Sequence, residues 1–430
     1  MKKEMILRCC RLPALTVLVA GILSLESAAQ QPAASITNTL TLDEAVQLAL
    51  TGNPEIKASV ARVEAAAGRA CQAKKWSNPE LELNAEEWPA SGGRGFADAK
   101  QTIGISQVLP YPGKKALDVQ VGGANVRLSE AQMAVRRTEI VRDVKAGFFR
   151  VLAAERMLAV AAQLAAVAQA SAAVASNRVE AGAAAFQEQL RAELQWEQAR
   201  VELAGFEREA ATARQMLAAL LGRPEMRDAR LEGVLAETPN AALLAADGAA
   251  ANHPSLSAAR ANLEQTRLAY RRARLEPYPD VKVVVSGGQI GESDASIIQV
   301  GFSLPLPLLD GGKGRQQEAQ ANVRAAEAEL LLAQQQLQRE WANAQKRYRA
   351  AAHQTGQYRD RILPKAGAAL ALVQAGFAQG KFSFMDLLDI QRTTAETQLT
   401  YQQKLLELNL AQAELEALLQ PQTNPTKNRK

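Results

Sequence analysis

Two acidic residues, Asp386 and Asp389, follow an interruption of a long helical pattern in the segment QGKFSFMDLLDIQRTTAE (379–396). The first pattern stops at Gly380, and a new one begins near Phe384. At a spacing of three residues both carboxylates lie on one helix face, where together they can attract cations. Judged by type and spacing alone, such a pair is most often a solvated surface pair. Its interest depends on the elements that position it.

A weaker copy of this segment, EAGAAAFQEQLRAELQWE, lies 198 residues earlier in the chain. The matched residues are Gly182 with Gly380, Phe186 with Phe384, Glu188 with Asp386, and Arg191 with Asp389. The two glycines can take the positive φ that a helix stop needs. Because the second acid of the pair becomes a base in the copy, a favourable first helical turn explains the pair poorly.

No other pattern predicts catalysis, a cofactor or a metal site. GFAQGKF has three residues between its glycines, and no Ser or Thr follows Lys381, so it is not a phosphate-binding loop. His253 and His353 are too far apart for a local metal motif, and no nucleophile–base pattern appears. A net charge of +5, interspersed along the chain, argues against nucleic acid as a partner. We therefore expect a protein that is not an enzyme.

The first 29 residues predict a secretory signal peptide. A basic start is followed by an apolar run of 14 residues (12–25), and Ser27 and Ala29 supply small residues before Gln30. We expect cleavage after Ala29. Only Cys71 then remains, which excludes an internal disulfide. No later stretch of 18 apolar residues is expected, which excludes a membrane-spanning helix.

The rest of the chain contains an internal repeat, in which the same architecture occurs twice. Pro54 and Pro79 match Pro254 and Pro279, and IGISQVLP matches VGFSLPLP. We expect a first repeat (30–222), an inter-repeat linker (223–252), a second repeat (253–420) and a polar C-terminal tail (421–430).

Each half predicts a helix, two alternating strands, a very long helix and a return helix. The long helices cover Lys115–Ala181 and Lys313–Gln379, and only Pro364 interrupts the second. The strands end at strand-to-helix corners, because proline cannot donate to a ladder. The corner residues are Pro110, Pro112, Gly113, Pro305, Pro307 and Gly312. Trp76, Trp88 and Tyr278 flank the strands, where they would sit at a membrane interface or pack at the base of a barrel.

An exported chain with four alternating strands suggests an outer-membrane β-barrel. Four strands cannot close a barrel, and open edges are forbidden in lipid, so several chains must pool their strands. Two chains would give eight strands and three would give twelve. The alternative is that the strands form soluble hairpins at the end of a periplasmic coiled coil.

The double repeat, the opening LTLDEAVQLALTGNPEIKAS, the corner SQVLPYPGKK and the segment GKFSFMDLLDIQRT resemble the TolC-like outer-membrane efflux family. Within that family the chain looks most like the outer-membrane components of cobalt-zinc-cadmium-type resistance systems. The resemblance covers about residues 40–420. It implies a mainly α fold with a small β part: a homotrimer with a twelve-stranded β-barrel in outer-membrane lipid, continued by a twelve-helix periplasmic α-barrel.

The resemblance also implies a function and partners. The chain would be the passive exit duct of a tripartite pump, working with a periplasmic adaptor and an inner-membrane RND-type, proton-driven pump. Heavy-metal cations are the implied substrate. Organic-molecule efflux and type I protein secretion stay open as alternatives, as does a periplasmic coiled-coil protein without a channel.

Site roles follow from the same resemblance. The helix breaks correspond to the periplasmic tips on which the adaptor docks, and the two acids to residues that narrow the tunnel mouth. The implied docking residues are Gly182, Phe186, Gly380, Lys381, Phe382 and Phe384, and the implied constriction acids are Asp386 and Asp389. We expect the side chains of Phe382 and Phe384 to be exposed, as a docking surface requires.

Overall fold

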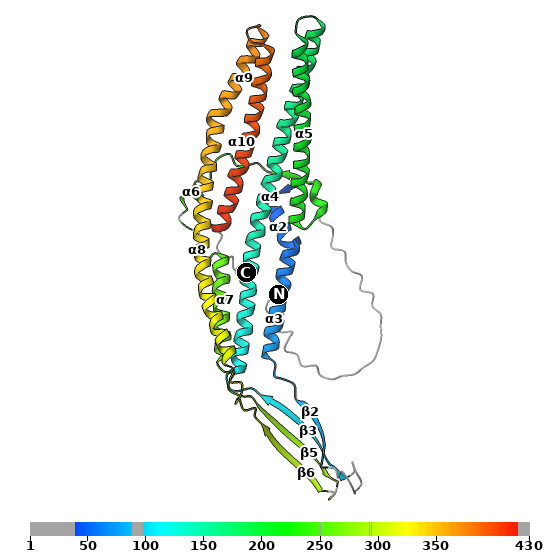
Figure 1. The fold of residues 1–430 in the computed structure, drawn as a ribbon, viewed down its shortest axis with the longest axis vertical. Coiled ribbons are helices and arrows are strands. Elements are labelled where there is room, and N and C mark those ends of the chain that lie inside the picture. The colour runs from blue at the N-terminus through cyan, green and yellow to red at the C-terminus, as the bar shows by residue number, and fades with distance from the viewer. Residues whose placement is uncertain are drawn as a thin grey trace. The chain divides into compact units, whose positions relative to one another are not determined.

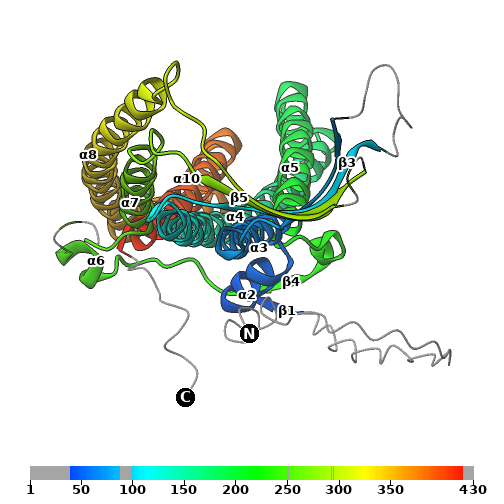
Figure 2. The same cartoon turned by 90° about the horizontal axis from the view of Figure 1, so that it is seen from below.

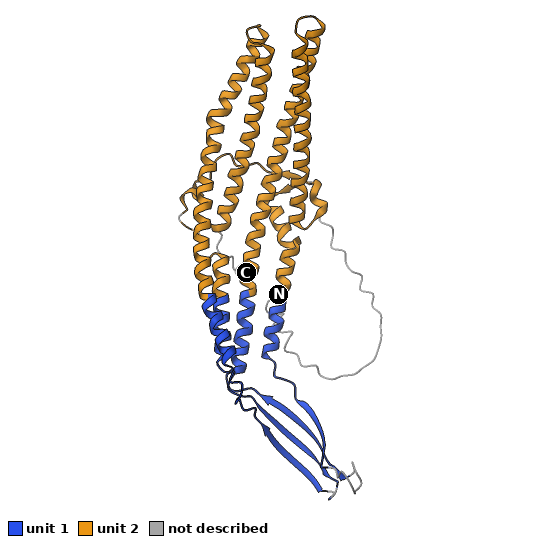
Figure 3. Cartoon of the chain, viewed as in Figure 1, with its two compact units in different colours: residues 1–37, 63–128, 262–326 blue, residues 38–62, 129–261, 327–430 orange. Residues whose placement is uncertain are grey.

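The computed structural model describes residues 39–87, 98–246, 248, 251–291, 293 and 295–419. The expected signal peptide, Trp88, the turn glycines 92, 93 and 95 and the polar tail (421–430) lie outside the described residues. The described chain forms two compact units, coloured separately in Figure 3. Unit 1 contains residues 63–128 and 262–326, and unit 2 contains residues 38–62, 129–261 and 327–430.

Helices account for most of the described chain (Figure 1). Their bounds are α2 Leu42–Gly52, α3 Pro54–Lys74, α4 Lys114–Glu180, α5 Phe186–Leu221, η2 Pro224–Asp228, α6 Ala241–Ala245, α7 Pro254–Ala273, α8 Lys313–Gln357, η3 Tyr358–Ile362, α9 Leu363–Ala378 and α10 Phe384–Leu419. The strands are β1 Thr39–Thr41, β2 Glu80–Glu86, β3 Lys100–Leu109, β4 Arg230–Glu232, β5 Val281–Ile290 and β6 Ala295–Ser303. Helix, two strands, long helix and return helix thus occur twice, whereas each compact unit takes parts of both copies. The repeat limits stay a prediction.

Unit 1 contains one antiparallel sheet with the strand order β2-β3-β5-β6 (Figure 1). Two hairpins, one from each repeat, meet where β3 pairs with β5. The register places Ile105 opposite Leu81 on one side and opposite Val285 on the other, and Val285 opposite Val300. Among the described residues no strand pairs with the outer edge of β2 or of β6.

The apolar face of this sheet is exposed and its polar face is buried, which is the reverse of a sheet in a soluble protein. Directly opposed residues share a face, and one face is apolar and exposed, with Ile298 at 84% and Phe302 at 74% of full exposure. Its members are Leu81, Leu83, Ile103, Ile105, Val285, Ile298, Val300 and Phe302. The other face carries the buried hydroxyl residues Thr102, Ser106 and Ser286. A sheet that exposes apolar side chains and covers polar ones suits an apolar solvent outside and water inside.

Close backbone approach on the polar face requires glycine. A Cβ on Gly288 would lie 1.9 Å from the carbonyl oxygen of Gln101, and one on Gly104 would lie 2.6 Å from the Cβ of Ser286. A glycine in a strand often marks such a close approach or a bend. The polar face is therefore crowded, whereas the apolar face is open.

Unit 2 is built of two helix hairpins, α4 with α5 and α9 with α10. Its largest core lies where the middle of α4 meets the end of α5 and the middle of α10, with Phe148, Leu221 and Leu405 fully buried. Nearer the turns α4 and α5 meet through alanines, with Ala165 and Ala168 against Ala199. Small side chains let helices approach closely over a long distance.

The segment expected to be a simple linker is folded onto unit 2. It holds η2, β4 and α6, and β4 pairs in parallel with β1 beside α2 (Figure 2). Asn409 of α10 accepts a hydrogen bond from the N–H of Ala236 (3.0 Å) and donates one to its carbonyl (3.1 Å). The N–H of Asn240 donates to the hydroxyl of the buried Tyr348 (2.7 Å). These bonds fix the linker to α8 and α10.

The long helices agree with the expected lengths to within a residue at each end. α4 runs for 67 residues, whereas its counterpart is divided by a π-helical turn, Tyr358–Ile362, directly before Pro364. Proline lacks an N–H and its ring clashes with the carbonyl four residues earlier, so the turn widens there.

By length and composition alone, α4 also contains a window apolar enough to cross a membrane. The expectation that no such stretch follows the signal peptide was wrong by this measure, because residues 157–177 are rich in alanine and carry no charge. A third of that window is buried. Core helices pass the same test, so it is weak support for a membrane span.

The crowding at Gly288 gives a test of the sheet. We expect Gly288→Ala to force β3 and β5 apart, costing about 1–3 kcal/mol as overpacking typically does. Gly287→Ala is the matched control, since its Cβ would meet nothing closer than 3.7 Å. The thermal unfolding midpoint of detergent-extracted protein should fall for the first variant only. Equal midpoints would contradict the register described above.

Candidate functional sites at the hairpin turns and the strand-to-helix corners

The two hairpin turns of unit 2 are the same helix-ending motif. Gly182 and Gly380 both have φ of +70°. The N–H of Ala183 donates to the carbonyl of Arg178 (2.8 Å), and the N–H of Lys381 donates to that of Gly376 (2.8 Å). These bonds span five residues, which defines a Schellman motif with glycine at its left-handed position. No heavy atom outside its chain neighbours lies within 4 Å of a Cβ built on either glycine, so backbone conformation alone selects glycine.

Asp386 closes a capping box at the start of α10. Its carboxylate accepts hydrogen bonds from the N–H (2.9 Å) and the hydroxyl (2.7 Å) of Ser383, and the Ser383 hydroxyl accepts one from the N–H of Asp386 (3.1 Å). The hydroxyl, and then the backbone N–H, hold the pKa of Asp386 below its ordinary value. Asp386 thus has a structural role in the first turn of α10, as an N-terminal cap.

Asp389 lies one turn further along α10 and is exposed, as Asp386 is. The next turn carries Arg392, which forms an ion pair with Glu396 (2.7 Å) and interacts electrostatically with Asp389. The structure therefore brings the two acids to one exposed face near the turn, as their spacing predicts.

The corresponding acid of the first hairpin does something different. Ala185 precedes α5 and offers no side-chain cap. Glu188 instead lies 3.9 Å from Arg178 on α4. The two matched acids therefore differ in role although they match in position.

Arg178 joins the two hairpins close to their turns. Its guanidinium lies 5.9 Å from the ring centroids of both Phe377 and Phe384, within the range of cation–π attraction. All four helices of the two hairpins therefore contribute to this contact. Arg178 lies on α4 and Glu188 on α5, and the two rings lie on α9 and α10. Glu188 supplies the opposite charge that a half-buried guanidinium needs.

The expectation that Phe384 is exposed was wrong. Only 4% of Phe384 is exposed, because it fills a small core with Ala172, Ala175 and Ala192. Its counterpart Phe186 is 60% exposed. Phe382 is 37% exposed, and its ring packs over the bare backbone of Gly376, where a Cβ would lie 2.2 Å from it. Of the three phenylalanines named for the turns, the exposed ones are thus one from each hairpin, Phe186 and Phe382.

The strand-to-helix corners of unit 1 lie where they are expected. Pro110, Pro112 and Gly113 connect β3 to α4, and Gly113 has φ of +92°. Pro305, Pro307 and Gly312 connect β6 to α8, and Gly312 has φ of +67°.

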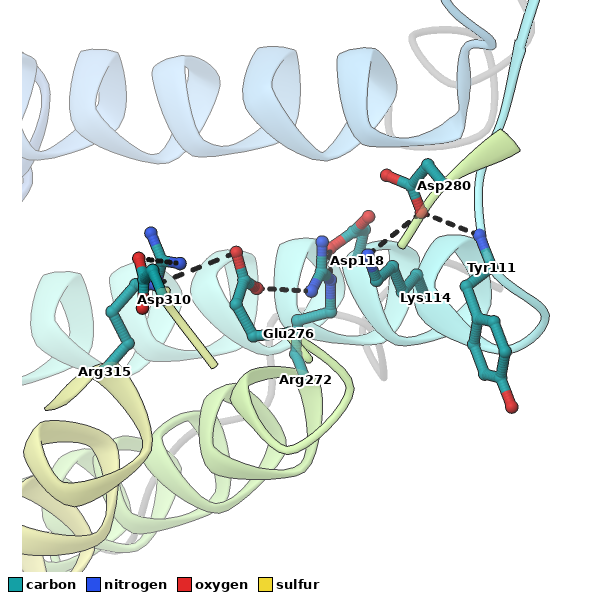
Figure 4. Close-up of polar contacts among 8 residues, drawn as sticks. All are labelled: Tyr111, Lys114, Asp118, Arg272, Glu276, Asp280, Asp310 and Arg315. Carbon is teal, nitrogen blue, oxygen red and sulfur yellow. Dashed lines mark hydrogen bonds and ion pairs between the residues drawn. The ribbon is translucent and has the colours of Figure 1, made fainter. Parts of the chain in front are cut away.

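A charge network that sequence reasoning missed holds the first corner (Figure 4). Asp280, directly before β5, accepts hydrogen bonds from the N–H of Tyr111 (2.8 Å) and from the ammonium of the buried Lys114 (2.9 Å). Burial works to raise the pKa of Asp280, but the Tyr111 N–H and Lys114 together hold it below its ordinary value. The stacked rings of Tyr111 and Tyr278, 4.6 Å apart, flank this contact.

The network continues across the second corner (Figure 4). Arg272 on α7 pairs with Asp118 on α4 (2.7 Å) and with Glu276 (3.0 Å). Arg315 on α8 lies 3.9 Å from Glu276 and 3.2 Å from Asp310, and Asp310 also accepts from the N–H of Gly312 (2.8 Å). Three of its contacts join residues 154 to 169 positions apart in sequence, so no local pattern could have shown them.

Within the described parts of the chain, no group of three or more His, Cys, Asp or Glu side chains is placed to hold a metal ion. His253, one of the two histidines, instead precedes α7 and accepts a hydrogen bond at Nδ1 from the N–H of Ser255 (3.3 Å). Asp386 and Asp389 therefore belong to no such group among the described residues.

Long alanine-rich helix hairpins, matching turns and a four-stranded sheet with an exposed apolar face describe a membrane-channel protein of duplicated architecture. The outer membrane efflux protein family model matches the chain twice, over residues 45–223 and 245–419. The chain belongs to this family of efflux proteins, and it is an outer-membrane protein that extends into the periplasm.

Similar proteins agree with the family. The cobalt-zinc-cadmium resistance protein CzcC of Cupriavidus metallidurans is 28% identical over 365 residues, covering 84% of this chain and 85% of CzcC. The nickel-cobalt-cadmium resistance protein NccC of Alcaligenes xylosoxydans is 25% identical, covering 66% of this chain and 65% of NccC. The crystal structure of VceC from Vibrio cholerae has the same fold, with a TM-score of 0.73, 19% identity and coverage of 89% and 97%. The resemblance seen in the sequence is confirmed.

The left-handed glycines give a test of the turns. We expect Gly380→Ala to destabilise the turn by about 1–2 kcal/mol, the usual cost of a left-handed conformation for a residue with a Cβ. Gly380→Asn should behave nearly as wild type, because asparagine tolerates that conformation. Limited proteolysis should cut the alanine variant faster between residues 376 and 384. Gly367→Ala, which changes a helical glycine with open space around it, should leave the rate unchanged.

Proposed function

We propose that this protein is the passive outer-membrane exit duct of a tripartite efflux pump. The observation that carries the proposal is the sheet of unit 1, which exposes an apolar face, covers a polar one and leaves both outer edges open. Lipid offers no hydrogen-bond partners, so only a closed barrel satisfies such edges in a membrane. The alternative of soluble hairpins is disfavoured, because water would meet a continuous apolar face.

Closure requires further copies of the chain. Each copy supplies four strands, and the smallest membrane barrels have about eight. Three copies would form a twelve-stranded barrel, and their long hairpins would form a twelve-helix barrel that continues it. Each copy would pair its β6 with β2 of the next, which is a head-to-tail contact that closes into a ring.

The turns of unit 2 are proposed as the docking tips for a periplasmic adaptor, which would connect the duct to an inner-membrane RND-type pump. Phe186 and Phe382 offer apolar contacts there, and the neighbouring Lys381 is exposed. Phe384 supports the tip from within its core and leaves the direct contact to its neighbours. Gly182 and Gly380 set the shape of the turns.

Asp386 and Asp389 are proposed as the acids that narrow the tunnel mouth. Three copies around an axis would gather six carboxylates, which repel one another and attract cations. Heavy-metal cations are the proposed substrate, supported by the resistance named for CzcC and NccC. Organic-molecule efflux or protein secretion is the second candidate, since a duct need not bind its cargo.

Native mass spectrometry and planar bilayers test the duct together. In detergent the protein should have the mass of three chains, and in bilayers it should conduct ions. A folded monomer in lipid, or a trimer that gives no conductance under any voltage or salt condition, would contradict the proposal.

The role of Asp386 and Asp389 is tested by variants that remove the negative charge and keep a side chain able to cap α10. Asp386→Asn with Asp389→Asn should reduce cation selectivity and block by multivalent cations, measured as reversal potentials under a salt gradient. Alanine at Asp386 is unsuitable, because it would also break the capping box with Ser383. Glu225→Gln with Asp228→Asn is the matched control, since it removes the same charge from exposed positions of unit 2 far from the turns in sequence. Identical reversal potentials in all three proteins would show that these acids do not set selectivity.

A further inference from the structure

A second exposed apolar feature of unit 1 lies outside the sheet. Four leucines follow β6 in the segment SLPLPLLD, and all are exposed: Leu304 at 48%, Leu306 at 68%, Leu308 at 84% and Leu309 at 104%. Leu304, Leu306 and Leu308 continue the two-residue spacing of Val300 and Phe302 on the apolar face, and Leu309 follows directly. We call residues 304–309 the leucine segment. Its side chains contact little of their own chain.

Backbone pairing cannot continue along this segment. Pro305 and Pro307 have no N–H, and the N–H of Leu308 already donates to the carbonyl of Leu306 (2.8 Å). The ladder on the outer edge of β6 must therefore end near Ser303. Whatever covers the leucine segment meets it through side chains.

The opposite edge of the sheet offers a matching feature. Trp76 lies four residues before β2 and is 59% exposed. Between them, Pro79 likewise removes a backbone donor. A large exposed ring thus precedes the first edge strand, just as exposed leucines follow the last.

Antiparallel pairing brings these features together in neighbouring copies. β6 leads toward the leucine segment, and an antiparallel β2 begins at that same end. The apolar faces of the two strands must coincide, which fixes the pairing to alternate positions. With Ser303 opposite Glu80, both strands end together and the chain at Trp76 lies beside the stretch from Leu306 to Leu308. Trp76 lies outside β2, so the alternation of that strand does not fix the direction of its side chain.

We propose that Trp76 of one copy packs against the leucine segment of the next copy, sealing each junction of the barrel where its backbone ladder stops. The inference rests on the proposed closure of the barrel by copies of this chain. It assigns Trp76 to a contact between copies and not to a lipid interface. Three such contacts would close the ring.

Disulfide trapping in outer membranes tests the contact. In a Cys71→Ser background, Trp76→Cys is combined in turn with Leu304→Cys, Leu306→Cys or Leu308→Cys, and the protein is oxidised with copper phenanthroline. Leu306→Cys and Leu308→Cys should give dimer and trimer bands in most of the protein, and Leu304→Cys at least fivefold less. Trp76→Cys with Leu109→Cys is the matched control, because Leu109 ends the internal strand β3 and should give no bands between copies.

A second pair separates this contact from the barrel itself. Glu80→Cys with Ser303→Cys probes the edge pairing alone. Bands from this pair without bands from any Trp76 pair would overturn the contact, leave the barrel standing and assign the leucines to lipid. No bands from any pair, in protein that reaches the outer membrane, would overturn the contact together with the proposed closure.

Discussion

The open edges of one four-stranded sheet are the constraint on which the rest of the structure depends. β2 and β6 each present a row of backbone donors and acceptors on the outer side, while the flanking face is apolar. In water the face is unfavourable, and in lipid the edges are unfavourable, so neither solvent suits a single copy. Only closure with further strands resolves both, and a duplicated chain with four strands cannot close on itself. On the proposed closure by further copies, backbone hydrogen bonding would set the need for those copies before any side-chain contact is considered.

The strand-to-helix corners of unit 1 determine how the helices continue from the strands. Each of the strands β3 and β6 passes into a helix within a few residues, where the proline pairs stop the ladder and Gly113 and Gly312 adopt positive φ. Flexible corners would let the helices swing relative to the strands. The ion pairs around Asp280, Arg272 and Arg315 oppose this, since together they connect both corners to α4, α7 and α8. A network shares the entropic cost of ordering among several contacts, so it holds geometry better than isolated surface pairs do.

The sequence was sufficient for the features that have a local cause. Alternation predicted the strands, the absence of proline predicted α4, and the glycines predicted both turns, because each depends on the residues within one element. Features that depend on distant residues could not be predicted. The burial of Phe384 depends on alanines from α4 and α5, the network at Asp280 joins the two repeats, and the folding of the linker depends on Asn409 and Tyr348. Phe186 shows the limit of reasoning from a repeat. It matches Phe384 in residue type and position, but Phe186 is exposed whereas Phe384 is buried.

The two hairpins also show why matched acids need not share a role. Glu188 is held near Arg178, so its charge is partly compensated within the chain. Asp386 is held by neutral donors from Ser383, which stabilise the carboxylate and leave its charge uncompensated. If three copies gather these acids around an axis, mutual repulsion would act to raise the pKa of Asp386 and favour its protonation. The capping box acts in the opposite direction, because it lowers the pKa of Asp386 in each copy. The capping box at the start of α10 would in this way also keep a ring of carboxylates charged. Such a ring can attract cations without binding any of them tightly.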